Sequence, residues 1–417
     1  MRVIHLNYSD TIGGASRAAF RIHSSLLQAG LDSKMWVNHS HSGDWTVEGP
    51  SLKRNKALVL LRKQIGKTFS SVLKTSNPIL HSPAILPSNW VHKINASDAD
   101  IVNLHWIAGE MLSIKDIARI KKPVVWTLHD MWGFCGAEHY SNNHRWIDGY
   151  RDNNRPNDEH GFDLNRWVWE RKLKNWKQPM HIVTPSHWLG ECVARSALMN
   201  AWPVSVIPNP INTDSWKPIK KKVARSLLGL PLDKSLLIFG AVEGIENYYK
   251  GFDLLLAALK HLKKSLVSKD IQIIVFGQRP PKSPFKDLDF PIHFAGYLHD
   301  DITLRLFYSA ADVVLNPSRQ EAFGQTASEA HACGTPVVAF DNSGLTSVVD
   351  HKKTGYLAKA FDINDFSSGI SWVLKEKKND FLNKNARLKT ETSFSYSQVA
   401  EQYRLVYKKV ISNHNLR

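Results

Sequence analysis

Two glutamates frame a stretch with the composition of a ligand site. Glu321 and Glu329 stand eight positions apart in SRQEAFGQTASEAHACGTPVVAF, on either side of Phe323-Gly324. The small residues that follow predict a helix beginning near Gly324, with the backbone N–H groups of Gly324 and Gln325 at its start. A helix start attracts anions, and a carboxylate accepts hydrogen bonds from two adjacent hydroxyls. The stretch therefore predicts a site for a ligand that carries phosphate and hydroxyl groups, such as a sugar nucleotide.

Each acid has a separate expected role in holding such a ligand. Glu321 would accept from hydroxyls of the sugar, and Glu329 would accept from the two hydroxyls of the ribose. Lys250 stands just before the helix predicted for FDLLLAALKHL, where its charge and the helix start would act on the same diphosphate. The alternative is two solvated glutamates and an ordinary exposed lysine. If Lys250 and the helix starts carry the phosphate charge, no divalent metal or other cofactor is needed, and we expect none.

Two features of the first half point to the same kind of ligand. Gly13-Gly14 follows the first apolar strand (2–7) and opens a helix, where the backbone can approach a ligand closely. The spaced glycines of a dinucleotide-binding loop are absent. Ser186 follows the apolar strand in HIVTPSHWL, and it is predicted either to contact the ligand or to cap the next helix.

The elements that must position these residues alternate along the chain. Apolar strands are followed by amphipathic helices, which predicts parallel sheets with helical crossovers. The series restarts after a proline-rich link near residues 208–218. We predict an α/β protein of two doubly wound, Rossmann-like domains, 1–212 and 213–394, with a helix at about 395–417 packing back on the first. Ligands bind at the carboxyl ends of such strands, here in a cleft that the two domains face.

Two segments, 38–95 and 131–178, break this alternation, and the second is rich in aromatic and polar residues that suit recognition of a second substrate. Within the first, the block 52–74 contains no acid. At helical spacing its apolar residues share one face, and its basic residues lie largely off that face: Leu58, Leu61, Ile65, Phe69 and Val72 against Arg54, Lys63, Lys67 and Lys74. This pattern is typical of a helix on an anionic membrane, and the alternative is a surface helix packed on its own domain.

The bulk composition narrows the class of protein. The chain has 417 residues and a net charge of +16, so its surface attracts polyanions such as anionic lipid or phosphorylated substrates. It contains no recognisable nucleic-acid module, and nucleic-acid binding would not explain the paired glutamates. The start, MRVIHLNYSD, lacks the apolar core of a signal peptide, and no apolar run is long enough to span a membrane. We therefore expect a cytoplasmic protein.

The cysteines indicate a reducing compartment and no disulfide framework, because the three of them are far apart: Cys135, Cys192 and Cys333. A zinc site is an alternative for a group of four residues, but their spacing matches no usual zinc pattern. That group is Cys135, His139, His144 and His160.

The motifs resemble, over nearly the whole chain, those of the family 4 glycosyltransferases, which are retaining enzymes of the GT-B architecture. The similarity rests on the two glutamates with CGTPVVA after them, and on a series of further motifs in the expected order. These are GGASRAAF, TLHD, TPSHWL, VIPNPIN, KGFDLLLAAL, AGYL, SAADVVLNPS and SGLTSVVDHKKTGYLA. Within the family, the chain looks most like bacterial enzymes that build extracellular or O-antigen polysaccharides on a lipid carrier.

The resemblance implies transfer of a sugar, with retention, from a UDP- or GDP-linked donor to a glycan acceptor. A lipid-linked acceptor would place the reaction at the inner face of the cytoplasmic membrane. The resemblance also implies that His129 contacts the sugar near the reacting carbon, beside Lys250 and Glu321, and that the backbone at Gly296-Tyr297 lies near the nucleobase. Where many members carry a diphosphate-binding arginine, this chain has Ala241. The rival function is a sugar-nucleotide epimerase, or another enzyme of this architecture without an acceptor.

Overall fold

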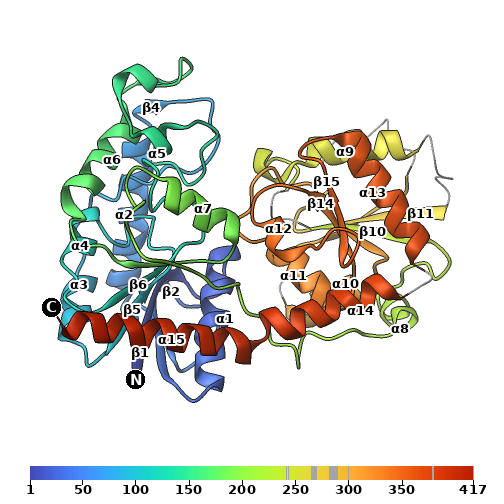
Figure 1. The fold of residues 1–417 in the computed structure, drawn as a ribbon, viewed down its shortest axis with the longest axis horizontal. Helices are drawn as coiled ribbons and strands as arrows, with labels where there is room; N and C mark the ends of the chain where they lie inside the picture. The colour runs from blue at the N-terminus through green and yellow to red at the C-terminus, as the bar shows by residue number, and fades with distance from the viewer. Residues whose placement is uncertain are drawn as a thin grey trace. The chain divides into compact units, whose positions relative to one another are not determined.

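The computed structural model divides into two compact α/β units, each built on a parallel sheet (Figure 1). It describes residues 1–240, 242, 244–263, 270–280, 290–298, 300–377 and 380–416. Unit 1 comprises Met1–Pro210 and Tyr396–Arg417, and unit 2 comprises Ile211–Ser395. The chain therefore passes between the units near the predicted boundaries at 212 and 394.

Unit 1 contains a seven-stranded sheet in the order β3-β2-β1-β5-β6-β8-β9, and all of its pairs are parallel. Its strands are β1 (Arg2–Ser9), β2 (Asp32–His39), β3 (Val47–Glu48), β5 (Ile101–Leu104), β6 (Val124–Thr127), β8 (His181–Thr184) and β9 (Val204–Val206). The central strands β5, β6 and β8 are buried at every position, as expected of parallel strands covered on both faces. The helices of the regular crossovers are α1 (Gly14–Gln28), α3 (Trp90–Ala96), α4 (Ile114–Ala118) and α7 (His187–Arg195).

The C-terminal helix α15 (Tyr396–Asn415) belongs to unit 1, where it lies beside α1 (Figure 1). Its buried residues join the same apolar cluster as Val3 of β1 and Ile22 of α1. Two buried tyrosines fix its register on the sheet. The Tyr407 hydroxyl accepts from Asn103 Nδ2 at 2.7 Å, and the Tyr403 hydroxyl lies 3.2 Å from Thr127 Oγ1.

Unit 2 contains a six-stranded parallel sheet in the order β12-β11-β10-β13-β14-β15. The strands are β10 (Ser235–Gly240), β11 (Ile271–Phe276), β12 (Ile292–Gly296), β13 (Val313–Asn316), β14 (Val337–Phe340) and β15 (Gly355–Ala358). Its α-helices are α8 (Lys221–Leu227), α9 (Phe252–Leu262), α10 (Asp301–Ala310), α11 (Gln325–Ala332), α12 (Leu345–Val348), α13 (Ile363–Glu376) and α14 (Phe381–Lys389). Two shorter helical turns are η2 (Tyr248–Lys250) and η4 (Thr390–Phe394).

The two segments that break the strand–helix alternation are joined in the fold. The short strand β4 (Leu73–Lys74), from the first segment, pairs antiparallel with β7 (His160–Gly161), from the second. The second segment also carries α5 (Arg145–Asp148), η1 (Asp152–Asn154) and α6 (Leu164–Asn175). Together they form one elaboration of unit 1.

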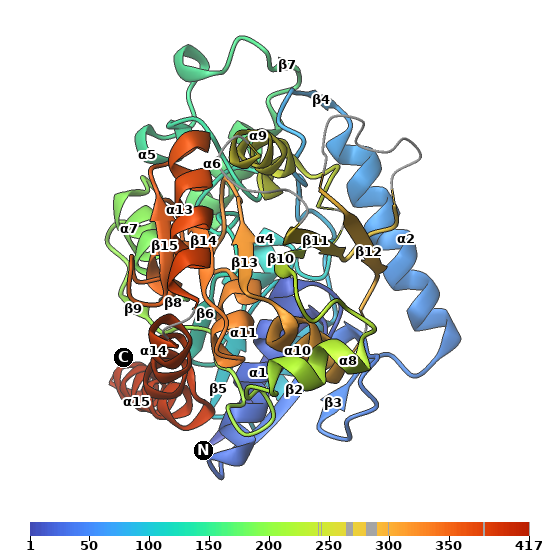
Figure 2. The ribbon, with the colours of Figure 1, turned by 90° about the vertical axis from the view of Figure 1, so that its right-hand side faces the viewer.

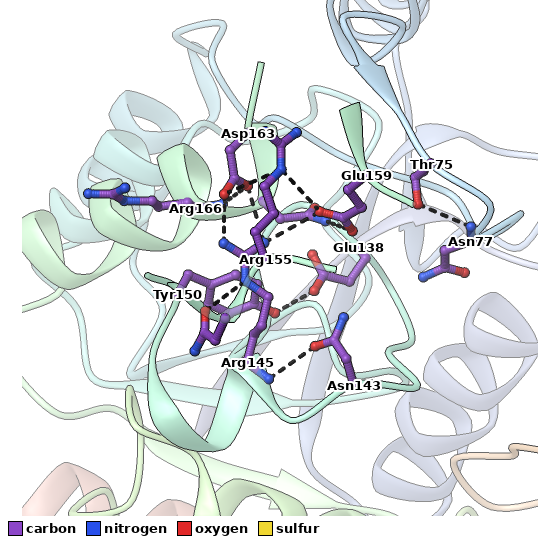
Figure 3. Close-up of polar contacts among 12 residues, drawn as sticks. Thr75, Asn77, Glu138, Asn143, Arg145, Tyr150, Arg155, Glu159, Asp163 and Arg166 are labelled. Atoms are coloured by element: carbon purple, nitrogen blue, oxygen red, sulfur yellow. Dashed lines mark hydrogen bonds and ion pairs between the residues drawn. The ribbon is translucent and has the colours of Figure 1, made fainter. Parts of the chain in front are cut away.

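A buried polar network holds this elaboration together (Figure 3). Arg145, whose side chain is 1% exposed, donates to Asp163 Oδ2 at 2.6 Å and to Glu159 Oε2 at 3.4 Å. The Tyr150 hydroxyl donates to Glu138. Removing one partner of a buried ion pair costs about 3–5 kcal/mol, because the other charge is left uncompensated. The elaboration is therefore a specifically packed structure, and its role in recognising a second substrate stays a prediction.

Helix α2 (Lys53–Ser70) packs on unit 1 along one side only and lies at its periphery (Figure 2). The guanidinium group of Arg62 donates to the backbone oxygens of Leu86, Pro87 and Glu110, at 2.6 to 3.0 Å. Phe69, which was predicted to share the apolar face of this helix, is half-buried, and its ring lies 5.5 Å from that of Trp167.

The other side of α2 and the residues just after it expose large apolar side chains. These are Leu58 (53% exposed), Leu60 (59%), Leu61 (57%), Ile65 (40%) and Val72 (42%). The helix ends at Ser70, before the end of the predicted block 52–74, because Leu73 belongs to β4, which pairs with β7. Among the described residues, none of the helices combines the length and the apolar character that a membrane-crossing segment needs.

Candidate active site

In unit 2 the structure brings together two of the predicted residues. The Lys250 ammonium nitrogen lies 2.6 Å from Glu321 Oε1, although the two residues are 71 positions apart. Lys250 ends the turn η2, and Glu321 lies in the loop between β13 and α11. Ser318 Oγ donates to the same carboxylate oxygen at 3.0 Å. The Lys250 side chain is 30% exposed and that of Glu321 is 16% exposed, so the pair remains accessible to a ligand.

Helix α11 begins where the sequence predicted. Gly324 caps it with a φ of 99°, a left-handed conformation that favours glycine, and an added Cβ would lie 2.6 Å from Leu345 Cδ2. Gln325 is the first helical residue. The ring of Phe323 is 2% exposed and packs against Phe394, with 5.4 Å between ring centroids. Of Phe323, only the backbone is therefore placed to approach a ligand.

Glu329 occupies the second turn of α11, as expected, but it is only 4% exposed. Its Oε2 accepts a hydrogen bond from the Tyr308 hydroxyl at 3.2 Å. Tyr308 lies in α10 and was not identified from the sequence. It holds the carboxylate of Glu329 in place, and contact with ribose hydroxyls stays a prediction.

Arg319 is a second residue that the sequence did not reveal. Its guanidinium group donates to both carboxylate oxygens of Asp253, at 2.8 and 2.6 Å, and to the Tyr248 backbone oxygen at 2.8 Å. It also lies over the Tyr248 ring, 4.0 Å from the centroid. The hydrogen bond to Arg319 lowers the pKa of Asp253. Arg319 thus ties the turn that carries Lys250 to the loop that carries Glu321.

The remaining unit 2 predictions concern the nucleobase and the missing arginine. Gly296 is the last residue of β12, and its carbonyl accepts from the Gly277 N–H at 2.7 Å. The next residue, Tyr297, is 42% exposed. Nucleobase contact at these two positions stays a prediction. Ala241 lies outside the described residues.

In unit 1 the predicted backbone positions lie at helix starts. Gly13 caps α1 with a φ of 90°, and Gly14 is the first helical residue. An added Cβ at Gly13 would meet no atom within 4 Å, so this glycine is favoured by its backbone conformation. Ser186 is fully buried and caps α7, because its Oγ accepts from the Leu189 N–H at 3.2 Å. The capping role is therefore the one its hydroxyl performs here.

His129 stands just beyond β6, where it lines a cavity at the carboxyl ends of β5 and β6. The other lining residues are His105, Trp106, Ile107, Ala108, Trp126, Leu128, Asp130, Trp132, Gly133 and His139. Burial lowers the pKa of His129 to about 4, although the nearby Asp130 opposes the shift. His129 is therefore neutral near pH 7, and it would act on a ligand as a hydrogen-bonding group.

Asp130 organises the wall of the same cavity. Its Oδ2 accepts from Trp106 Nε1 at 2.9 Å and lies 2.6 Å from His139 Nδ1. Burial raises the pKa of Asp130, but His139 and the Trp132 N–H outweigh that effect, and the net shift is downward. His139 Nε2 lies 2.8 Å from Ser82 Oγ, so both of its nitrogens are engaged. Across the part of the chain that the structure describes, no three His, Cys, Asp or Glu residues gather as metal ligands, and the residues of the zinc alternative are not assembled.

Both halves of the chain match known family models. The model described as Glycosyltransferase Family 4 matches residues 12–215, and the one described as Glycosyl transferases group 1 matches residues 230–390. The chain belongs to the family 4 glycosyltransferases. The predicted family is confirmed, and Lys250, Glu321 and His129 lie within the matched regions of this glycosyltransferase.

Individual relatives agree with this assignment. The D-inositol 3-phosphate glycosyltransferase of Xylanimonas cellulosilytica is 33% identical over 174 residues, which cover 38% of this chain and 40% of the relative. The glycosyltransferase spans about half the length of the curated relatives it matches.

Solved structures are similar over the whole chain. Sucrose-phosphate synthase from Thermosynechococcus elongatus has a TM-score of 0.67 at 18% identity, covering 99% of this chain and 100% of its own. HepE of Anabaena, solved with UDP and glucose, has a TM-score of 0.63 at 15% identity, covering 98% and 99%. These likenesses confirm the GT-B fold class that the sequence predicted.

Proposed function

We propose that this glycosyltransferase moves a hexosyl group from a nucleoside diphosphate sugar to a hydroxyl of a glycan acceptor, with retention of anomeric configuration. The observation that carries the proposal is the 2.6 Å pair of Lys250 and Glu321 beside the start of α11. It offers a cation and helix N–H groups to a diphosphate, and a carboxylate to sugar hydroxyls. A UDP- or GDP-linked donor fits this set, and HepE, of the same fold, was solved with UDP and glucose.

The proposed reaction proceeds by electrostatic stabilisation of the leaving group. As the bond between the anomeric carbon and the phosphate oxygen breaks, Lys250 and the N–H groups at the start of α11 oppose the negative charge that develops on the diphosphate. The acceptor oxygen forms the new bond on the same face of the sugar, and its proton passes to the departing phosphate oxygen. Glu321 holds the sugar hydroxyls while the ring carries positive charge. In this scheme no divalent metal or other cofactor takes part.

The proposed acceptor is lipid-linked, which makes the inner face of the cytoplasmic membrane the site of reaction. Helix α2 supports this part of the proposal, because its exposed leucines and Ile65 lie among basic residues and the helix contains no acid. Lys63 and Lys67 are both exposed. Each basic residue near an anionic surface contributes about 1 kcal/mol to binding, and the leucines add an apolar term. A role in bacterial surface polysaccharide synthesis fits a peripheral enzyme of this kind.

Binding of the donor can be tested directly by thermal stabilisation. A panel of UDP- and GDP-sugars is added to the full chain, where a ligand at a hundred times its Kd should stabilise by about 2.7 kcal/mol. The Lys250→Ala variant should lose this stabilisation, whereas Lys384→Ala, an exposed lysine on α14, should keep it. If no sugar nucleotide stabilises the wild-type protein, the proposal fails.

A further inference from the structure

Three histidine rings form a continuous hydrogen-bonded chain across three neighbouring strands of unit 1. His5 lies in β1, His105 follows β5 directly, and His129 stands just beyond β6. His5 Nδ1 is 2.8 Å from His105 Nε2, and His105 Nδ1 is 3.0 Å from His129 Nε2. The middle ring therefore uses both of its nitrogens within the chain.

The chain runs from the protein interior to the cavity at the candidate site. His5 is 0% exposed and His105 is 2% exposed, whereas His129 is half-buried, and both His105 and His129 line the cavity. At the inner end, His5 Nε2 is buried without a hydrogen-bond partner among the described residues. At the outer end, none of the described residues hydrogen-bonds His129 Nδ1.

All three rings are neutral near pH 7. Burial lowers the pKa of His129 to about 4 and places those of His5 and His105 well below their ordinary value. The neighbouring charges do not reverse this: His23 lowers the pKa of His5 further, and Asp130 raises that of His129 only in part. Each ring therefore carries one N–H and one bare nitrogen.

Each hydrogen bond between two of these rings needs one donor and one acceptor. The three histidines therefore have only two self-consistent proton arrangements. In the first, His5 Nδ1 donates to His105, and His105 Nδ1 donates to His129 Nε2. The proton of His129 is then on Nδ1. In the second, every donor is reversed, which moves the proton of His129 to Nε2 and leaves an N–H on His5 Nε2.

The inner end of the chain decides between the two arrangements. The second arrangement buries the N–H of His5 Nε2 without an acceptor, and the first buries only a bare ring nitrogen there. Orphaned buried N–H groups are rarer in proteins than under-satisfied acceptors. The His23 ring, 5.6 Å from that of His5, has both of its nitrogens bound to the hydroxyls of Ser33 and Thr46. The first arrangement is therefore favoured.

We propose that His105 and His5 are positioning residues that fix His129 in the tautomer with its proton on Nδ1. His129 then offers the cavity an N–H donor, which suits an oxygen atom of the sugar or of its leaving phosphate as the partner. The catalytic part of this inference rests on the proposed function, but the tautomer itself does not. Because both ring nitrogens of His105 are engaged by His5 and His129, His105 acts through His129.

The tautomer can be measured in the protein without any ligand. Long-range ¹H–¹⁵N correlation spectra of the histidine-labelled full chain report which ring nitrogen carries the proton, and the loss of one signal in His129→Gln assigns it. We expect the proton on Nδ1 in the wild-type protein. In His105→Leu, which removes the donor to His129 Nε2, the Nδ1–H population should fall. In His105→Asn, whose amide restores an N–H donor, it should recover. A wild-type proton on Nε2, or a population unchanged in His105→Leu, would overturn the proposal.

Steady-state kinetics with the sugar nucleotide that the enzyme uses then test the consequence for the reaction. His105→Leu should lower kcat by about 10- to 100-fold at nearly unchanged KM, by analogy with the losses seen when a partner that orients a metal-binding histidine is removed. His105→Asn should stay close to wild type. Equal losses in both variants would contradict a role through the tautomer. If the protein uses no sugar nucleotide at all, the proposed function fails. The spectra still decide whether His105 and His5 fix the tautomer of His129.

Discussion

Replacement of Lys250 by alanine should slow sugar transfer far more than it weakens the fold. The substitution removes an ammonium group that lies 2.6 Å from Glu321 Oε1 in a half-buried setting. A unit charge opposite a phosphate at about 4 Å is worth about 4 kcal/mol at the effective dielectric of such a site. Loss of one donor to a developing oxyanion typically costs about 2.7–4 kcal/mol. If the substitution raises the activation free energy by about 2–4 kcal/mol, kcat should fall about 30- to 900-fold.

The assay for this variant is steady-state release of nucleoside diphosphate in the presence of donor and acceptor. Lys384→Ala serves as the matched control, because it removes one exposed positive charge from a helix of the same unit. Thermal unfolding of both variants reports whether the fold is intact. A folded Lys250→Ala variant with kcat within threefold of the control would refute the role assigned to this lysine.

Three further perturbations have definite expected outcomes. Glu329→Ala should weaken nucleotide binding at least about tenfold, since hydrogen bonds to a charged group contribute about 1.5–3 kcal/mol. An unchanged affinity, measured by calorimetry on a folded variant, would contradict the role assigned to Glu329. Replacing Lys63, Lys67 and Lys74 by glutamate should abolish flotation with anionic vesicles at low salt but spare activity on a soluble acceptor analogue. Continued flotation would identify α2 as an ordinary surface helix. Finally, the free energy of unfolding should fall as the pH drops below about 6.5. Eight described histidines have pKa values lowered by burial, so the unfolded chain binds more protons there, at up to about 1.36 kcal/mol per pH unit for each residue. These are His5, His23, His39, His81, His105, His129, His181 and His331. Urea titrations at pH 7.5 and 5.5 measure the change, and equal stability at both would contradict it.

The sequence was most informative where local chemistry dictates local structure. The alternation of apolar strands and helices predicted two parallel sheets, because such strands must be covered on both faces. Gly324 marked the start of α11, and its left-handed backbone conformation there favours glycine. The types of Lys250 and Glu321 indicated a phosphate and a sugar, although their contact across 71 positions is a property of the fold.

Residues that act through distant partners were not predictable from the sequence. Arg319 owes its position to Asp253, 66 residues away, and nothing in the local pattern pairs them. The three-histidine chain joins residues 100 and 24 positions apart, and it exists only because β1, β5 and β6 are neighbours in the sheet. Helical spacing grouped Phe69 with the apolar residues of α2, but spacing does not reveal that Trp167 packs against it.

Acceptor-dependent sugar transfer is the measurement that tests the central claim most directly. The full chain is incubated with the sugar nucleotide that stabilises it, with and without lipid-linked glycan acceptors, and the products are followed by mass and by the NMR coupling of the anomeric proton. We expect nucleoside diphosphate to be released in step with a new glycosidic bond, only when acceptor is present, and with the donor's anomeric configuration kept. Conversion of the sugar nucleotide without acceptor, as an epimerase would produce, or an inverted product would contradict the account.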